Sequence, residues 1–325
     1  QAVSSYSQEE IAKNYFVNID VDYLDKIIAS GLIRHDQSSL FGSENRSRVY
    51  GRGTVAYIIS EDYEIKGIDF FKVRASYGTS GNRPQWNAQY ETFTVTTSSI
   101  VPGVLGNKKL LPSVTAELET GINIGFLDNF NFEFNYSKSS TKDDFILVPL
   151  SGVAGFRSQW QNVGEIESIY YEASLNGGII NSEAFNWNFG LVFDSGTQKI
   201  SDLGAVPPYT RSISGTAISI FRVEEGKPYG TMYGYKYATS IDQLSLIEGA
   251  IANIPAGGST SPGGVLSDYS INEYGYVINT ASKGSSSEAP MMIYDENKKA
   301  SAVTEIGNTN PKFNVGFSTD LTYKN

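Results

Sequence analysis

The sequence offers few residues suited to bond-making chemistry, and their spacing argues against that role. Asp143-Asp144 and Glu224-Glu225 are paired carboxylates, which acid–base catalysis or a calcium site would use. Adjacent side chains on a strand point to opposite faces, so neither pair could share one substrate there. We therefore interpret both pairs as solvated charge in loops.

Other reactive or ligand-binding groups are equally sparse. The single histidine, His35, has no obvious Ser or Cys partner on a nucleophile turn, and the chain has no Cys, which leaves little material for a zinc site. The run GTSGN at residues 78–82 resembles a phosphate-binding loop but lacks the Lys and the following helix. We interpret its glycines as a turn at a strand end. The sequence thus predicts no catalytic residue, no cofactor and no metal site.

Aromatic residues in predicted loops are better candidates for ligand contact. They are Trp86, Tyr90, Trp160 and Tyr209. Aromatic faces stack well on sugar rings and on peptide side chains. Packing within the loop, or against a partner protein, is an equally good explanation for each of them.

The elements that position these residues are strands with one apolar and one polar face. In residues 117–137, apolar and polar side chains alternate on both sides of a short turn at 127–129. Each arm has about ten residues, the length that a tilted strand needs to cross a bilayer core of about 30 Å. The pattern predicts two strands of an outer-membrane barrel. We interpret the row Phe130, Phe132 and Phe134 as lipid-facing rather than as a sugar-stacking platform.

The same alternation recurs along the chain and predicts about ten strands. The clearest are residues 15–23, 27–33, 49–59, 71–77, 117–126, 130–136, 169–177, 185–193 and 313–323. Short and long connections alternate, as periplasmic turns and external loops do in such barrels. We expect long external loops at about 35–47, 79–115, 139–167 and 196–311. The last is so long that we expect it to be functional or partly disordered.

Composition fits this interpretation. The chain has 325 residues, a formal net charge of −10, 32 Gly and 13% aromatic residues, and the acidic balance argues against nucleic-acid binding. No window approaches 18 apolar residues, which a barrel does not need. An open sheet edge cannot lie in lipid, and polar lumen positions are abundant, so we expect part of a larger barrel. No signal peptide is visible, so we expect the chain to begin mid-protein or after processing.

Six sequence runs resemble signatures of the SusC-like (SusC/RagA) TonB-dependent outer-membrane transporters of Bacteroidetes, in the family's order and spacing. They are IRHDQSSLFG at 33–42, FKVRASYGTSGN at 71–82, LPSVTAELETG at 111–121, NVGEI at 162–166, GKPYGTMYGY at 226–235 and IGNTNPKF at 306–313. Where relatives carry an Asp-rich stretch with Gly, residues 294–299 read YDENKK, so no ion site is carried over.

The resemblance implies an all-β fold: an antiparallel transmembrane β-barrel of about 22 strands, of which residues 1–325 form a later part. It implies a plug domain and final strands outside this chain, contact with TonB through the absent N-terminal part, and a SusD-like surface lipoprotein. It also implies active uptake of oligosaccharides or peptides in the outer membrane. A passive porin-like channel and a soluble β-rich carbohydrate-binding domain are the alternatives. The soluble domain predicts that Phe130, Phe132, Phe134 and Phe317 pack into a core.

Overall fold

The structure is a computed structural model that describes residues 8–42, 44–204, 206–211, 220–258, 262–297 and 300–324. The chain forms two compact units. The first, called the wall, comprises Gln1–Pro207, Glu224–Tyr229 and Pro311–Asn325; the second, called the lobe, comprises Pro208–Val223 and Gly230–Asn310.

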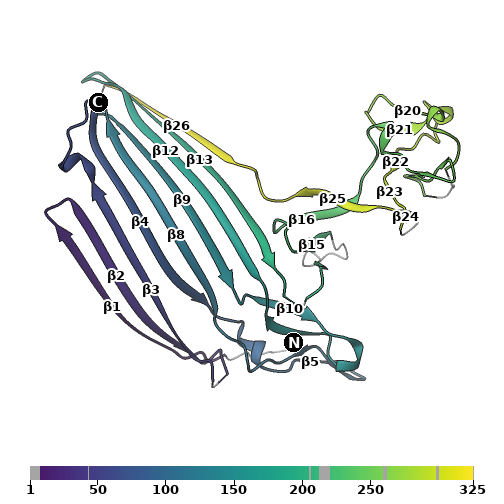
Figure 1. Cartoon of the computed structure of the whole chain (residues 1–325), viewed down its shortest axis with the longest axis horizontal. Coiled ribbons are helices and arrows are strands. Elements are labelled where there is room, and N and C mark those ends of the chain that lie inside the picture. Colours follow the sequence, from purple (N-terminus) through teal and green to yellow (C-terminus); the bar gives the residue numbers. More distant parts are fainter. Residues whose placement is uncertain are drawn as a thin grey trace. The chain divides into compact units, whose positions relative to one another are not determined.

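The wall is an antiparallel sheet that, within the described residues, has nine strands (Figure 1). The strands, in their order across the sheet, are β1 (Ala12–Tyr23), β2 (Ile27–Ser38), β3 (Ser47–Ile58), β4 (Ile68–Asn82), β8 (Ser113–Phe126), β9 (Phe130–Lys142), β12 (Glu165–Asn181), β13 (Phe185–Asp202) and β26 (Asn314–Tyr323). The all-β fold and the strands expected from alternation are confirmed. One interpretation is wrong: residues 78–82 form no turn, because β4 continues through Asn82.

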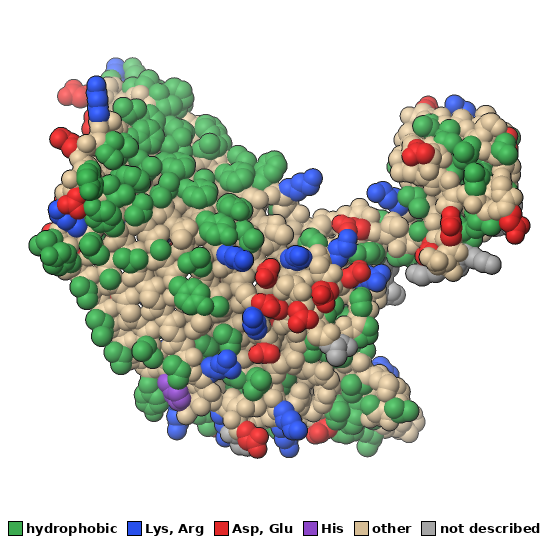
Figure 2. Space-filling view, viewed as in Figure 1, with side chains coloured by type: hydrophobic (Ala, Val, Ile, Leu, Met, Phe, Trp, Pro, Cys, Tyr) green, Lys and Arg blue, Asp and Glu red, His purple; other side chains and the backbone are tan. Residues whose placement is uncertain are grey.

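The pairing register sorts side chains into two faces. Ile124 lies opposite Phe132 on one face, and Asn123 lies opposite Glu133 on the other. The apolar face lacks the cover that a soluble core would need: Phe317 is 68% exposed, and Phe130, Phe132 and Phe134 on the same face are partly exposed. In Figure 2, hydrophobic side chains cover the turn end of the sheet and charged ones gather nearer the loops. A bare apolar sheet face suits lipid contact.

Tight turns fix this register at one end of the wall. Leu24 and Asp25 both have positive φ, as do Leu127 and Asp128, the backbone pattern of hairpin turns that match strand twist. The Asp128 N–H also donates to Asp69 Oδ2 on the neighbouring strand, at 2.7 Å. A slip by one residue would move every apolar side chain to the polar face, so these turns protect the sorting. The 3₁₀ turn η1 (Ile59–Glu61) lies at the same end.

At the opposite end, three connections join into what we call the loop layer, residues 39–42, 44–46, 83–112 and 143–164. Its elements are η2 (Trp86–Gln89), β5 (Phe93–Val95), β6 (Ile100–Pro102), β7 (Val104–Leu105), β10 (Phe145–Pro149), η3 (Gly152–Ala154) and β11 (Ser158–Asn162). Strand β11 pairs with β10 and, in parallel, with β7 from a different connection. Leu40, Phe41, Ala88 and Leu110 are buried in this layer.

One side chain, Asn162, ties two of these connections together. Its Oδ1 accepts from the Leu111 N–H at 2.8 Å, and its Nδ2 donates to the Leu111 and Asp143 carbonyls, each at 2.8 Å. The amide thus pairs with Leu111 as a neighbouring strand would. Two residues on, Gly164 has φ +84°, and a Cβ there would lie 2.5 Å from the Asp202 carbonyl oxygen. These contacts give the run NVGEI at 162–166 a structural role.

The lobe occupies most of the long connection expected at 196–311, of which residues 205, 212–219, 259–261 and 298–299 lie outside the described residues. Its elements are β14 (Tyr209–Arg211), β15 (Phe221–Val223), β16 (Thr231–Tyr235), η4 (Ile241–Gln243), β17 (Leu246–Ile247), β18 (Ala250–Ile251), β19 (Ile254–Pro255), η5 (Leu266–Asp268), β20 (Tyr269–Ile271), β21 (Val277–Asn279), η6 (Thr280–Ser282), β22 (Met291–Met292), β23 (Tyr294–Asp295), β24 (Ala300–Ser301) and β25 (Val303–Asn308). Ala238, Leu244, Ile251, Val277 and Met291 form a core within it. The described part of this connection is therefore largely a folded body.

Within the described residues, no helix has the length and apolar character needed to span a membrane.

The two faces of β26 should tolerate an added charge to different degrees. In the full-length protein, Phe317→Arg should lower the free energy of unfolding by about 2–4 kcal/mol, because it places a charge on the lipid face near mid-strand. Ser318→Arg, one residue later and on the polar face, should cost much less. Denaturant unfolding from lipid vesicles measures both, and equal costs would contradict the assignment of the faces.

The lobe predicts a pH dependence through Glu288. The Gly284 N–H donates to Glu288 Oε2 at 2.6 Å and Asn272 Nδ2 donates to Oε1 at 2.8 Å, and these bonds lower the carboxyl pKa below its ordinary 4.5. The stabilisation is therefore present above pH 4.5 and is lost as pH falls through the lowered pKa. The protection of residues 272–288 against amide hydrogen exchange, measured relative to the intrinsic exchange rate at each pH, should fall as pH drops through this lowered pKa.

Glu288→Gln should make the protection of that segment against exchange much less dependent on pH, whereas Glu273→Gln, at an exposed lobe position, should leave the pH dependence of the protection unchanged. An identical pH response of Glu288→Gln and the wild type would refute the role of Glu288.

Candidate functional site

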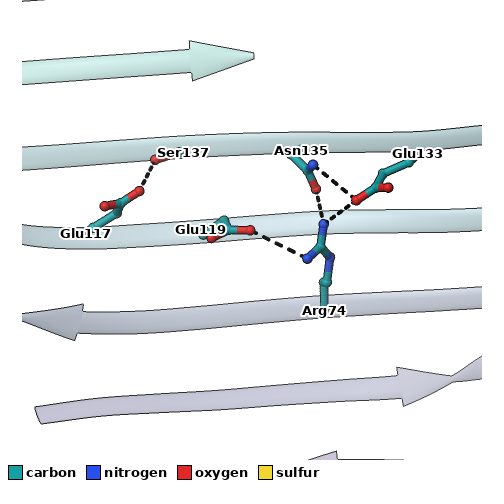
Figure 3. Close-up of polar contacts among 6 residues, drawn as sticks. All are labelled: Arg74, Glu117, Glu119, Glu133, Asn135 and Ser137. Carbon is teal, nitrogen blue, oxygen red and sulfur yellow. Dashed lines mark hydrogen bonds and ion pairs between the residues drawn. The ribbon is translucent and has the colours of Figure 1, made fainter. Parts of the chain in front are cut away.

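The polar face of the wall is centred on Arg74 of β4, which reaches across β8 to β9 (Figure 3). Its Nη2 lies 2.7 Å from Glu133 Oε1 and also contacts Asn135 Oδ1, and its Nη1 lies 3.6 Å from Glu119 Oε1. One guanidinium therefore serves two carboxylates and an amide from two strands.

A glycine makes this reach possible. Gly121 lies between Arg74 and Asn135 in the register. A Cβ at Gly121 would lie 2.8 Å from Arg74 Nε and 2.6 Å from Asn135 Oδ1, both closer than real Cβ contacts allow. The arginine thus lies over the space that the missing side chain leaves.

Acidic groups outnumber Arg74 on this part of the face. Glu117 accepts from Ser137 Oγ at 2.6 Å beside the cluster. Glu172 and Asp194 continue the row on β12 and β13, where Asp194 accepts from Asn314 Nδ2 at 2.7 Å. We call Glu117, Glu119, Glu133, Glu172 and Asp194 the acidic band. It provides a negatively charged surface suited to lining an aqueous passage.

The described residues contain no grouping of three or more His, Cys, Asp or Glu side chains able to hold a metal ion; residues 298 and 299 of the 294–299 segment lie outside them. Asp143 and Asp144 lie in the connection between β9 and β10, and Glu224 and Glu225 in the connection between β15 and β16. His35 stacks on Tyr15 with ring centroids 6.5 Å apart, on the apolar face of the wall.

The structure brings three of the four predicted ligand residues into one region. The rings of Trp86 and Tyr90, at the two ends of η2, contact each other in a tilted arrangement, with centroids 5.6 Å apart and planes at 43°. Trp160 lies on β11 in the same loop layer, where its carbonyl accepts from Asn107 Nδ2 at 2.8 Å. Tyr209 belongs to the lobe, where it pairs with Val223. Their role as ligand contacts stays a prediction.

Sequence reasoning missed the Arg74 cluster. Its signal was present, since Arg74, Glu119 and Glu133 each occupy the polar phase of an alternating strand. Only the register between strands shows that these three positions meet.

The family model described as "TonB dependent receptor-like, beta-barrel" matches residues 2–283. The chain belongs to this family. The resemblance found in the sequence is thereby confirmed, and the wall is part of a TonB-dependent receptor β-barrel of the bacterial outer membrane. The family is one of receptors and transporters rather than of enzymes.

Curated relatives come from Formosa agariphila. TonB-dependent receptor P3 is 28% identical over 343 residues, which cover 99% of this chain and 31% of that protein. TonB-dependent receptor P26 is 32% identical over 216 residues, covering 62% of this chain and 22% of that protein. The chain thus spans about a third, or less, of the length of the TonB-dependent receptors it matches.

Solved structures share the fold. The RagAB peptide transporter aligns with a TM-score of 0.71 and 23% identity, covering 97% of this chain and 32% of that one. The RagAB peptide importer in its closed-closed state gives 0.69 and 21%, covering 96% and 32%.

The Arg74 cluster predicts a non-additive pair of substitutions in the full-length receptor. Arg74→Gln should cost about 1 kcal/mol, because it removes charge-assisted bonds from a side chain that is one-third exposed. Gly121→Ala should cost a similar amount by displacing the same arginine. The double variant should cost little more than either one, because the second change finds no intact cluster.

Gly31→Ala is the matched control, since nothing lies within 4 Å of a Cβ at that strand position. Additive costs for Arg74→Gln and Gly121→Ala in denaturant unfolding would show that the glycine does not serve the arginine.

Proposed function

We propose that this chain forms part of the wall of an active importer that takes up oligosaccharides or peptides across the outer membrane. Membership in the TonB-dependent receptor family carries the proposal. In it, energy comes from TonB through a plug domain in the rest of the protein, and no bond-making step is assigned to any residue. The names of the RagAB transporters, which describe peptide import, support this class of solute.

The proposal places the connections at about 35–47, 79–115, 139–167 and 196–311 outside the cell, and the short turns in the periplasm. The first three of these connections meet in the loop layer, and long external loops opposite short periplasmic turns are typical of outer-membrane barrels, which supports this orientation. The aromatic pair Trp86–Tyr90 lies in this layer, with Tyr90 exposed, and we assign it to solute contact. Trp160 and Tyr209 are weaker candidates for solute contact.

The loop layer also presents a surface suited to a SusD-like lid lipoprotein. The β5–β6 hairpin exposes Phe93, Val95 and Ile100, and Val153 on η3 is 97% exposed. Phe93 stacks edge-on against Phe156, with ring centroids 5.8 Å apart, so the hairpin and the η3 turn are neighbours. Contiguous exposed apolar groups outside the membrane are typical of protein–protein contact sites.

The lid contact predicts a selective loss of the partner. In the full-length receptor purified from native outer membrane, Ile100→Glu should reduce the recovered SusD-like lipoprotein at least about tenfold, because it places a charge in an apolar interface. Tyr63→Glu, an equally exposed position at the turn end of the wall, should leave recovery unchanged. Full recovery with Ile100→Glu would remove the hairpin from the contact.

The import step itself is tested by energy dependence. Cells carrying the full-length receptor should accumulate a fluorescent tripeptide library or a labelled oligosaccharide mixture only when TonB is present. Accumulation that continues unchanged without TonB would overturn active import and favour a passive channel.

A further inference from the structure

A second charged feature of the wall has the opposite sign to the acidic band. A pocket of about 140 Å³ lies on the polar face, at the loop end of β2, β3 and β4. Its lining includes one acidic residue, Asp36, and four arginines: Arg34, Arg46, Arg48 and Arg83. The whole chain carries a net charge of −10, so four arginines around one small volume stand out from their surroundings. We call this the arginine pocket.

Strand register builds the pocket. In the register between β2 and β3, Asp36 lies opposite Arg48 and Arg34 lies opposite Tyr50. The side chains of these four residues therefore share the polar face. The Tyr50 side chain is buried at 6% exposure, and the Arg34 guanidinium lies over its ring at 5.8 Å. Gly81 on β4 leaves room for this tyrosine, since a Cβ there would lie 1.8 Å from Tyr50 Oη.

Three of the arginines have partners that hold them in place. Arg34 Nη2 lies 2.9 Å from Asp36 Oδ2, Arg46 Nε donates to the Phe41 carbonyl at 3.2 Å, and Arg83 Nη1 lies 2.5 Å from Glu10 Oε1. A guanidinium has five N–H donors, so each of these contacts leaves others for a ligand.

Two arginines of the pocket have N–H donors without an acceptor. Arg34 Nε is buried and has no hydrogen-bond partner within the described residues. Arg48 lines the pocket and is exposed. Within the described residues, its side chain makes no hydrogen bond and no ion pair. A buried donor without an acceptor is costly, and an anion would relieve that cost.

We propose that the arginine pocket binds a carboxylate group of the imported solute, an inference that rests on the importer function proposed above. The planar fork of arginine matches the two oxygens of a carboxylate. The pocket, about 140 Å³ in volume, has room for one such anionic group.

The acidic band favours binding of a carboxylate at the arginine pocket rather than elsewhere on the polar face. Further along the same face, Glu117, Glu119 and Glu133 repel an anion, whereas the arginine pocket attracts it. A solute with one carboxylate would therefore be held at the loop end of the wall in a fixed orientation. Carboxylates occur both in acidic peptides and in uronate oligosaccharides, and the experiment separates these sources.

Binding to the full-length receptor in mild detergent tests the proposal. The probes are tri-glutamate and tri-galacturonate, with tri-alanine amide and maltotriose as solutes without a carboxylate, measured by calorimetry at two salt concentrations. At least one acidic probe should bind more tightly than its neutral counterpart, and more weakly at high salt. Which acidic probe binds identifies the source of the carboxylate.

Arg48→Gln should weaken that binding at least about tenfold, because a charge-assisted bond is lost. It breaks no internal ion pair, so folding should be intact. Arg52→Gln, the same change on the same face of β3 but outside the pocket, should leave affinity within about twofold.

The proposal is overturned if neither acidic probe binds, if neutral probes bind equally well, or if Arg48→Gln and Arg52→Gln behave alike. An acidic group elsewhere in the longer protein that fills the pocket would produce the first of these results. All of them leave TonB-dependent accumulation untouched, so failure of this inference is distinguishable from failure of the import function.

Discussion

The wall depends on one constraint: in lipid, every backbone N–H and C=O must be paired within the protein. The long antiparallel ladder from β1 to β26 meets that demand between neighbouring strands. Because side chains alternate along each strand, the same ladder places one set in lipid and the other on the polar face. The position of Arg74 between Glu119 and Glu133 is a consequence of that register and could not survive a slip of one residue.

Outside the sheet, polar side chains form the hydrogen bonds with backbone groups that neighbouring strands form within it. Asn162 pairs with the backbone of Leu111 as a strand would, and Gln89 Nε2 donates to the Ser39 carbonyl at 3.1 Å. These bonds join connections that are distant in sequence into one layer with buried Leu40 and Leu110. The loops of the wall therefore form a platform on which exposed side chains such as Tyr90 and Ile100 hold defined positions.

Alternation in the sequence was sufficient to predict the strands and their faces, because a period of two is a local signal that the sheet preserves. It could not predict the loop layer, since Leu111 and Asn162 are 51 residues apart and no periodic pattern relates them. Glycine was the most misleading residue. Gly81 suggested a turn, but the position requires glycine because a side chain there would collide with the ring of Tyr50 on the neighbouring strand. The sequence also did not reveal the arginine pocket, because Arg34, Arg48 and Arg83 come together only when the strands of the sheet pair.

The lobe bears on how the chain assembles. Strand β26 pairs with β13 although the connection between them runs from Asp202 to Asn314, so their pairing must close a loop of more than a hundred residues. The lobe buries its own core, at Val277 and Met291 among others, and a body that folds first removes about 80 residues from that loop. By the logarithmic dependence of closure entropy on length, this lowers the cost by roughly 1 kcal/mol. Early folding of the lobe would then make addition of β26 to the edge of β13 faster than the bare chain length suggests.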